Sequence, residues 1–226
     1  MKKNILLTGD SKGLGRSIKS TLESKGYNVI GISRTSNDIK FDLSDTDEIK
    51  HLYLNIIKAR GPIHGFVNNA AFAYDDIITN LNSTELLKMY NINVLSPMML
   101  TKYVIRDMLL NKTKGNIIHI SSISAHTGYK GLAMYASTKG ALEAFSKNTA
   151  REWGKLGIRS NVICPGFMNT SMSSTLNYSQ REKIFKRNSL QSELKVDEVS
   201  SVVGFLLSDD SSGITGQVVH VDNGTI

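Results

Sequence analysis

The sequence is poor in cysteine and in proline, and it has no long apolar run. Cys164 is the only cysteine among 226 residues, so no disulfide can form within the chain. It also has no partner at metal-ligand spacing in the sequence. We therefore predict no metal site and interpret Cys164 as a small buried apolar residue.

Long apolar segments are also missing. The first apolar run ends at Thr8-Gly9, too early for the apolar core of a secretory signal peptide. No later stretch reaches the length of about 20 apolar residues that a membrane-spanning helix needs. We expect a cytoplasmic protein that does not bind membranes.

The chain has an excess of basic residues, with 27 Lys and Arg against 20 Asp and Glu, a formal net charge of +7 and a pI near 9.4. Such a charge could indicate a nucleic acid, an anionic membrane or an acidic protein as partner. However, the cations are scattered rather than clustered, and the aromatic residues fall mostly at core-like positions. We predict no nucleic-acid partner, and a positive field that would help to attract a phosphate-bearing cofactor.

Short apolar segments alternate with stretches of helical periodicity. We expect strands at 4–7, 28–33, 39–43, 65–68, 116–120, 160–163 and 217–221. We expect helices at 14–22, 44–57, 83–110, 135–155 and 196–207, the second of them opened by Ser44.

This alternation predicts an α/β fold. We expect a single doubly wound Rossmann-type domain over residues 1–226, with a parallel sheet of about seven strands and helices on both faces. Ligands of such sheets bind beyond the carboxyl ends of the strands. Residues 170–195 are the most polar and least periodic, so we predict a mobile substrate lid there.

A glycine-rich turn follows the first predicted strand and precedes the first predicted helix. Glycines allow a tight turn there and let backbone N–H groups approach a pyrophosphate at the helix N-terminus. The spacing Thr-Gly-x-x-x-Gly-x-Gly over residues 8–15 therefore predicts a dinucleotide site. Its candidate cofactor-binding residues are Thr8, Gly9, Ser11, Lys12, Gly13, Leu14 and Gly15.

The end of the second predicted strand indicates which dinucleotide binds. NAD-binding folds usually present an acid to the ribose 2′-OH at this position, whereas this chain has Ser33-Arg34. Because Arg34 and Lys12 would converge on a 2′-phosphate, we predict NADPH rather than NADH. Asp10 would repel the phosphates unless it points to solvent.

A possible catalytic group surrounds the fifth predicted strand. Ser121 and Ser122 end that strand, and Tyr135 and Lys139 follow four residues apart on one face of a predicted helix. A tyrosine has a reference pKa of about 10, and an adjacent ammonium would lower its pKa toward the working range of an acid-base catalyst. One serine could hold the substrate oxygen. His119, earlier on the strand, is more typical of a structural histidine.

These motifs resemble, over essentially the whole chain, those of the short-chain dehydrogenase/reductase family. The resemblance selects Ser122 over Ser121 and implies a catalytic tetrad of Asn93, Ser122, Tyr135 and Lys139, with Asn93 in a water-linked proton relay. Lys139 and Tyr135 would also contact the cofactor. Further cofactor contacts implied by the resemblance are Asp42, Leu43, Asn69, Ala70, Pro165, Gly166, Met168 and Thr170.

The resemblance has three further implications. The 34–40 connection is too short for the family's usual crossover helix, so this edge of the sheet should be trimmed. The helix with Tyr135 carries small residues. In the family this helix commonly packs against a second copy of the chain, which implies a homodimer or homotetramer. The alternative is a protein that binds the cofactor as a regulator and is not an enzyme. Such a protein would have lost part of the tetrad, whereas this chain retains all four residues, so the resemblance favours an enzyme.

The resemblance also implies that the substrate is a small-molecule carbonyl compound. The segments after Pro165 and at the C-terminus are most similar to 3-oxoacyl-[acyl-carrier-protein] reductases, so the substrate could be a 3-oxoacyl thioester on an acyl carrier protein. Reductases of sugars, polyols and small ketones share this similarity. Met134, Met168 and Met172 could line an apolar pocket or pack in the core.

Overall fold

The computed structural model describes residues 2–170 and 177–226. Its centre is a parallel seven-stranded sheet in the order β3-β2-β1-β4-β5-β6-β7. The strands are β1 (Asn4–Thr8), β2 (Asn28–Ser33), β3 (Ile39–Lys40), β4 (Gly65–Asn68), β5 (Gly115–Ile120), β6 (Ile158–Pro165) and β7 (Val218–Val221). This order reverses between β1 and β4, so the predicted doubly wound α/β fold is confirmed.

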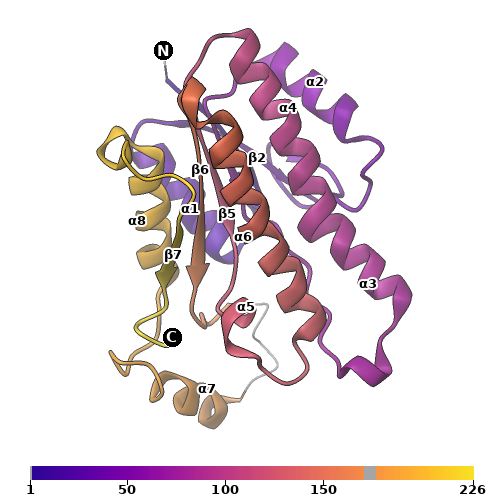
Figure 1. Cartoon of the computed structure of the whole chain (residues 1–226), viewed down its shortest axis with the longest axis vertical. Coiled ribbons are helices and arrows are strands. Elements are labelled where there is room, and N and C mark those ends of the chain that lie inside the picture. The colour runs from indigo at the N-terminus through magenta and orange to yellow at the C-terminus, as the bar shows by residue number, and fades with distance from the viewer. Residues whose placement is uncertain (1, 171–176) are drawn as a thin grey trace.

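Helices cover both faces of the sheet (Figure 1). On one face lie α1 (Gly13–Ser24) and α8 (Val196–Leu207), and on the other lie α2 (Ile49–Arg60), α4 (Ser96–Leu110) and α6 (Ala133–Trp153). The shorter elements are η1 (Ile78–Asn80), α3 (Ser83–Tyr90), the π-helical η2 (Asn91–Leu95), α5 (Ser124–Thr127), η3 (Gly154–Leu156), α7 (Tyr178–Phe185) and η5 (Asp209–Ser211).

Most apolar side chains of the central strands belong to one of two apolar cores. Leu6 and Ile30 pack against α2 and α4, whereas Ile5, Leu7 and Val29 pack against α1 and α8. Because both faces are covered, every residue of β1 is buried. This double burial explains why the central strands are continuous apolar runs in the sequence.

Two element boundaries differ from the sequence prediction. Ser44 does not open α2, because the Asp42 carboxylate accepts hydrogen bonds from the Ser44 N–H at 2.9 Å and from its hydroxyl at 2.8 Å, which forms a turn instead. β3 is shorter than 39–43. Lys40 pairs with Ser33, the last residue of β2, so residues 41–43 have no residue of β2 to pair with.

Other expectations about the chain's course are met. The 34–38 connection contains no helix, and α3, η2 and α4 form one helical run over 83–110 with a π turn inside it. The described part of the predicted lid contains α7, which Asn177 and Gln180 open with a capping box. Residues 171–176, with Met172, lie outside the described residues. Nowhere in the described ranges is a helix long and apolar enough to cross a membrane.

Candidate active site

The glycine turn after β1 is held in one conformation by close packing. Gly9 has a φ of +71°, which favours glycine, and its N–H donates to the carbonyl of Ile32 at 2.7 Å. A Cβ atom on Gly15 would overlap the carbonyl oxygen of Gly9. Lys12, the N-cap residue of α1, makes no side-chain capping hydrogen bond. The first N–H groups of α1 are therefore not capped by this side chain, as expected of an anion site.

Thr8, Asn69 and Ala70 fasten this turn to the end of β4. The Thr8 hydroxyl accepts the backbone N–H groups of Asn69 and Ala70, both at 3.1 Å. The Asn69 amide donates to the carbonyls of Thr8 at 3.2 Å and Gly9 at 3.1 Å. The structure thus gives these side chains a positioning role, and their predicted contacts with a cofactor stay predictions.

Asp10 neither points to solvent nor stands unpaired. Its carboxylate is buried, accepts the Ser36 hydroxyl at 2.8 Å and lies 3.7 Å from the ammonium of Lys19. This side chain is therefore directed toward β2. The sequence left open whether Asp10 repels the phosphates or points to solvent, and it does not reveal the space beside Gly31 that receives this side chain.

Lys12 and Arg34, the two basic residues predicted to bind the 2′-phosphate, lie at the expected places. A third basic residue, Arg16, lies near the same turn. Lys12 and Arg34 are exposed at the glycine turn and just after β2. The Arg16 guanidinium donates to the carbonyl of Ser11 at 2.8 and 3.1 Å. This interaction was not predicted, although Ser11 and Arg16 are only five residues apart around the turn. The Ser11 hydroxyl in turn accepts that of Thr35 at 3.0 Å, which joins the turn to the end of β2.

Asp42 and Leu43 differ in exposure. Asp42 is exposed, and the hydrogen bond from the Ser44 N–H holds its pKa below the usual range, with a smaller contribution from the charge of Arg34. Leu43 is buried in the core, and its carbonyl accepts the Ser96 hydroxyl. The Leu43 side chain is thus turned inward, and its predicted contact with the cofactor stays a prediction.

The two serines after β5 point in different directions. Ser121 is buried and donates to the Glu143 carboxylate at 2.6 Å. Ser122 is half-buried, and its hydroxyl accepts the Ser124 N–H at 3.2 Å. Ser121 is thus occupied by α6, whereas the Ser122 hydroxyl keeps its own proton to donate.

Tyr135 and Lys139 lie on successive turns of α6. The buried Lys139 ammonium donates to the carbonyl of Ile120, the last residue of β5, at 2.8 Å and lies 5.5 Å from the centre of the Tyr135 ring. Burial lowers the pKa of Lys139 to about 8. The helix therefore holds both groups at the end of β5, where Ser122 begins the next loop.

The pKa of Tyr135 does not shift in the direction expected from the sequence. Burial raises it, and the negative charge of Asp75 adds to this effect. The lowering expected from Lys139 does not appear, because burial of the hydroxyl dominates. Tyr135 consequently retains its proton at neutral pH, which is the state that can donate to a carbonyl oxygen.

Asn93 lies in the π turn and is fully buried. Its amide oxygen accepts the Phe72 N–H at 2.8 Å, and its nitrogen donates to the Phe72 carbonyl at 2.8 Å and to the Thr138 hydroxyl at 3.1 Å. The side chain therefore ties the loop after β4 to α6, one residue before Lys139. Its predicted part in a proton relay remains a prediction.

The segment after β6 passes the glycine turn. Gly166 packs against the C-terminal segment, since an added Cβ would lie 2.8 Å from the Cα of Asp222. Further along, Thr170 lies 3.8 Å from the position of a Cβ on Gly13. The structure thus brings Pro165, Gly166 and Thr170 to the carboxyl edge of the sheet.

Three residues considered for the site belong to the core. Met134 is buried, and Met168 packs against the cluster of α1 and α8. His119 is fully buried between the rings of Phe66 and Phe145, and burial lowers its pKa to about 3. His119 is neutral and structural, as the sequence favoured.

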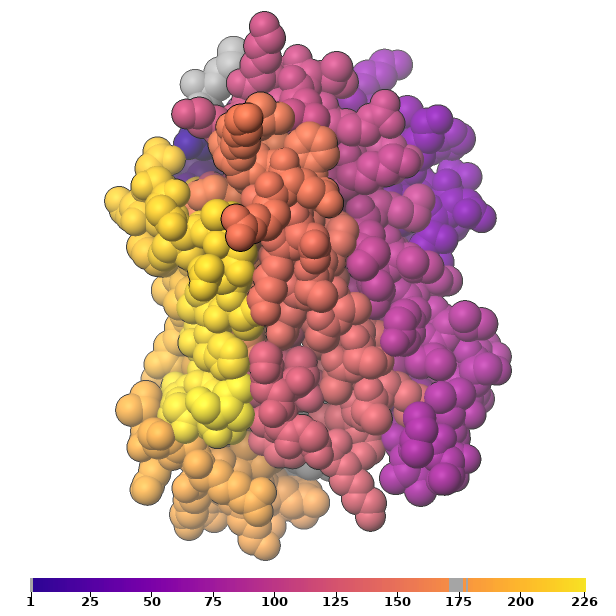
Figure 2. All heavy atoms as spheres, viewed as in Figure 1, coloured from indigo at the N-terminus to yellow at the C-terminus, as the bar shows by residue number. Residues whose placement is uncertain are grey.

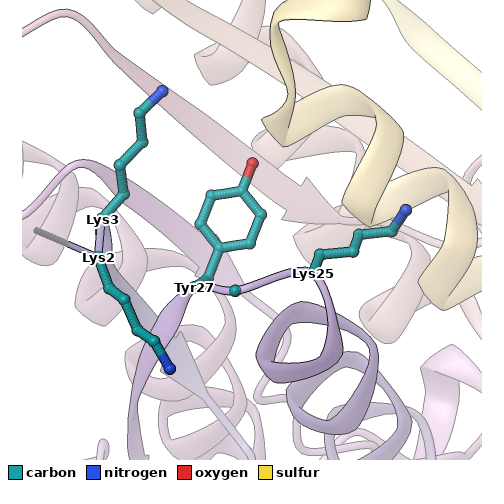
Figure 3. A pocket seen from close by; sticks show the side chains of 5 residues that line it. Lys2, Lys3, Lys25 and Tyr27 are labelled. Atoms are coloured by element: carbon teal, nitrogen blue, oxygen red, sulfur yellow. The ribbon is translucent and has the colours of Figure 1, made fainter.

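A hollow of about 560 Å³ lies at the opposite end of the sheet, lined by Lys2, Lys3, Lys25, Gly26 and Tyr27. Figure 3 shows that the lysine side chains extend in different directions rather than toward one point. This hollow has no part in the arrangement at the strands' carboxyl ends.

Comparison with known proteins assigns this arrangement to a family. A family model described as "Enoyl-(Acyl carrier protein) reductase" matches residues 28–225. The 3-oxoacyl-[acyl-carrier-protein] reductase FabG of Salmonella typhimurium is 34% identical, over 97% of this chain and 95% of the relative. FabG of Buchnera aphidicola subsp. Schizaphis graminum is 32% identical, over 99% of this chain and 97% of the relative.

A solved structure described as "ElxO with NADP Bound" superposes with a TM-score of 0.92 at 28% identity, covering 100% of this chain and 99% of that one. The family resemblance predicted from the motifs is therefore confirmed over nearly the full length. The chain belongs to the short-chain dehydrogenase/reductase family and is an oxidoreductase.

Proposed function

We propose that this protein reduces the 3-oxo group of a 3-oxoacyl thioester carried on an acyl carrier protein, with NADPH as the reductant. Reduction of a carbonyl with NADPH agrees with the relatives named FabG and with the NADP-bound neighbour. The thioester is the finer part of the proposal, and the names of the similar reductases support it.

The residues present fit a dinucleotide phosphate. The N-terminus of α1 lacks a side-chain cap, Gly9 and Gly15 bring backbone close to it, and Lys12 and Arg34 are exposed beside it. These groups would hold the phosphates, and Lys139 would contact the ribose near the reacting end. When bound, NADPH supplies the hydride.

The chain's own residues then control the proton. Ser122 donates a hydrogen bond to the substrate carbonyl oxygen, which orients it and stabilises the charge that develops there. The protonated Tyr135 hydroxyl gives its proton to that oxygen. Lys139, fixed by the Ile120 carbonyl, places its positive charge where it offsets the phenolate left behind.

The observation that carries the proposal is that Ser121 and Ser122 have different hydrogen-bond partners. The Ser121 hydroxyl donates to Glu143, so of these two serines it is Ser122 that keeps a donor for a substrate oxygen at the end of β5.

A substrate panel tests the function. Purified protein with NADPH is given a 3-oxoacyl thioester, the matching 2-enoyl thioester, a keto sugar and a simple ketone, and oxidation of NADPH is followed. We expect kcat/KM for the 3-oxoacyl thioester to exceed the others by about tenfold or more. Preference for the keto sugar, the ketone or the enoyl compound would overturn the thioester assignment.

A matched pair of variants links turnover to the site. Tyr135→Phe should lower kcat by roughly two to four orders of magnitude while NADPH still binds. Tyr129→Phe removes the same hydroxyl from an exposed tyrosine and should leave kcat unchanged. Near-normal turnover of Tyr135→Phe would contradict the mechanism.

A further inference from the structure

A second cluster of reactive side chains lies beyond the tetrad, where α5 meets the ends of β6 and β7. It consists of His126 on α5, Cys164 on β6 and His220 on β7, and one ligand atom from each lies within 4.8 Å of the others. The two imidazole rings are 4.9 Å apart, centre to centre. In Figure 1 these three elements meet near the C-terminus.

The chemistry of this cluster suits one class of ligand. Imidazole nitrogens and a thiolate are donors that Zn²⁺ binds well, and zinc sites with three protein ligands take a solvent molecule as the fourth. Hard cations such as Mg²⁺ and Ca²⁺ prefer oxygen ligands. The donor set therefore selects a borderline-soft transition metal.

A carboxylate supports one of the two imidazole rings. Oε1 of Glu143 lies 3.0 Å from Nε2 of His126, and the same oxygen accepts the Ser121 hydroxyl at 2.6 Å. Metal-binding histidines are commonly oriented by such a carboxylate, which fixes the ring and raises its basicity. Glu143 is itself held in place, because Ser121 at the end of β5 binds it.

The spacing is close to that of a bound metal. Zinc–nitrogen bonds of about 2.0–2.1 Å and a zinc–sulfur bond of about 2.3 Å in a tetrahedron put the ligand atoms roughly 3.3–3.7 Å apart. Both histidines are exposed, so their side chains can rotate by the small amount required. Cys164 is buried and supplies a fixed point.

We propose that His126, Cys164 and His220 bind a zinc ion, with solvent as the fourth ligand. On binding, the Cys164 thiol releases its proton to solvent and the thiolate coordinates the metal. Because each ligand comes from a different element, the ion cross-links α5, β6 and β7. This site could not be recognised in the sequence, and the prediction of no metal site missed it, since the three residues are far apart along the chain.

Metal titration of the whole protein tests the proposal. Stripped of metal and kept reduced, it is titrated with Co²⁺ as a spectroscopic probe and with Zn²⁺ in a calorimeter. We expect one equivalent to bind, a thiolate-to-cobalt charge-transfer band to appear, and Zn²⁺ to raise the melting temperature. Absence of the thiolate band would overturn the proposal.

Variants assign the ligands. Cys164→Ala should abolish the charge-transfer band, and His220→Gln should weaken Zn²⁺ binding at least about tenfold, as loss of one ligand does. His220 is exposed, so this variant keeps the fold even if Cys164→Ala does not. His51→Gln, which removes an exposed histidine of α2, should bind like the wild type.

Equal Zn²⁺ affinity in the wild type and in His220→Gln would show that the cluster is not the site. No NADPH or carbonyl substrate enters these titrations, so their outcome is independent of the proposed reductase activity.

Discussion

Gly31 leaves open the space that the carboxylate of Asp10 occupies. A Cβ atom on Gly31 would overlap Oδ2 of Asp10, and Ser36 and Lys19 supply the hydrogen bond and the charge that this buried carboxylate needs. A glycine on the neighbouring strand thus accommodates the side chain of a residue in the glycine turn.

Gly31→Ala should therefore destabilise the protein. The new methyl group must displace Asp10 from its partners, and we expect a loss of about 1–3 kcal/mol in the free energy of unfolding. Urea denaturation measures it. Gly213→Ala is the control, because a Cβ there meets nothing within 4 Å. An unchanged midpoint for Gly31→Ala would mean that Asp10 has an alternative position.

The two serines after β5 should separate catalysis from stability. Ser122→Ala should lower kcat by about 100-fold or more, since it removes the donor to the developing oxyanion. Ser121→Ala should cost about 1–3 kcal/mol of stability, because Glu143 loses a buried hydrogen bond, with a smaller effect on kcat. Steady-state kinetics and urea denaturation of both variants check this, and the reverse pattern would exchange the assignments.

The central fold could be predicted from the sequence because its signals are local. The residues of β1 and β4 are buried on both faces, which produces short apolar runs between turn residues. Spacing along one helix likewise revealed Tyr135 and Lys139. Such features require no knowledge of which segments meet in space.

The sequence was insufficient where side chains from distant segments decide the structure. The start of α2 depends on whether Asp42 binds Ser44, and the orientation of Asp10 depends on Gly31 across the sheet. The pKa of Tyr135 depends on burial that only the folded chain creates.

Self-association should use the outer face of α6. Figure 2 shows this helix uncovered along the middle of the face in view. Its side chains there are small, and a Cβ on Gly140 would meet nothing within 4 Å. We expect a dimer or tetramer in sedimentation, and Ala144→Glu should shift it toward the monomer by burying a charge at the contact. As a control, Asn55→Glu on the exposed side of α2 should not change the oligomeric state. A wild-type protein that sediments as a monomer would refute the expectation.

The lowered pKa of Lys139 should appear in the pH dependence of stability. The unfolded chain holds this proton up to about pH 10.5 and the folded chain only to about pH 8. Between these values the unfolded state binds more protons, so stability rises with pH. Relative to Lys139→Met, wild-type stability should rise by about 1 kcal/mol per pH unit between pH 8 and 10. The raised pKa of Tyr135 acts only above its ordinary value of 10.

Urea denaturation at several pH values measures this difference. Lys147→Met, which removes an exposed lysine from the same helix, should keep the pH profile of the wild type. Parallel profiles for the wild type and Lys139→Met would show that Lys139 keeps an ordinary pKa in the folded protein.

Arg34 should determine the preference for NADPH. A 2′-phosphate carries close to two negative charges near neutral pH, and the guanidinium offers it paired, charge-assisted hydrogen bonds, each contributing about 1.5–3 kcal/mol. Arg34 is exposed just after β2, where no acid replaces Ser33 at the strand end. Asp42, whose pKa Arg34 helps to lower, is already satisfied by Ser44. An exposed guanidinium at this position can turn its donors toward the phosphate.

Calorimetric titration with both cofactors measures this preference. We expect NADPH to bind at least about tenfold more tightly than NADH, and Arg34→Ala to remove most of the difference while leaving NADH affinity nearly unchanged. Lys12→Ala should have a smaller effect, and Ser33→Asp combined with Arg34→Ala should reverse the preference, since a carboxylate then faces the phosphate. Lys3→Ala removes an equal charge from the opposite end of the sheet and is the control for a general field effect. Equal affinities of the wild type for NADPH and NADH would mean that neither cation reaches the phosphate.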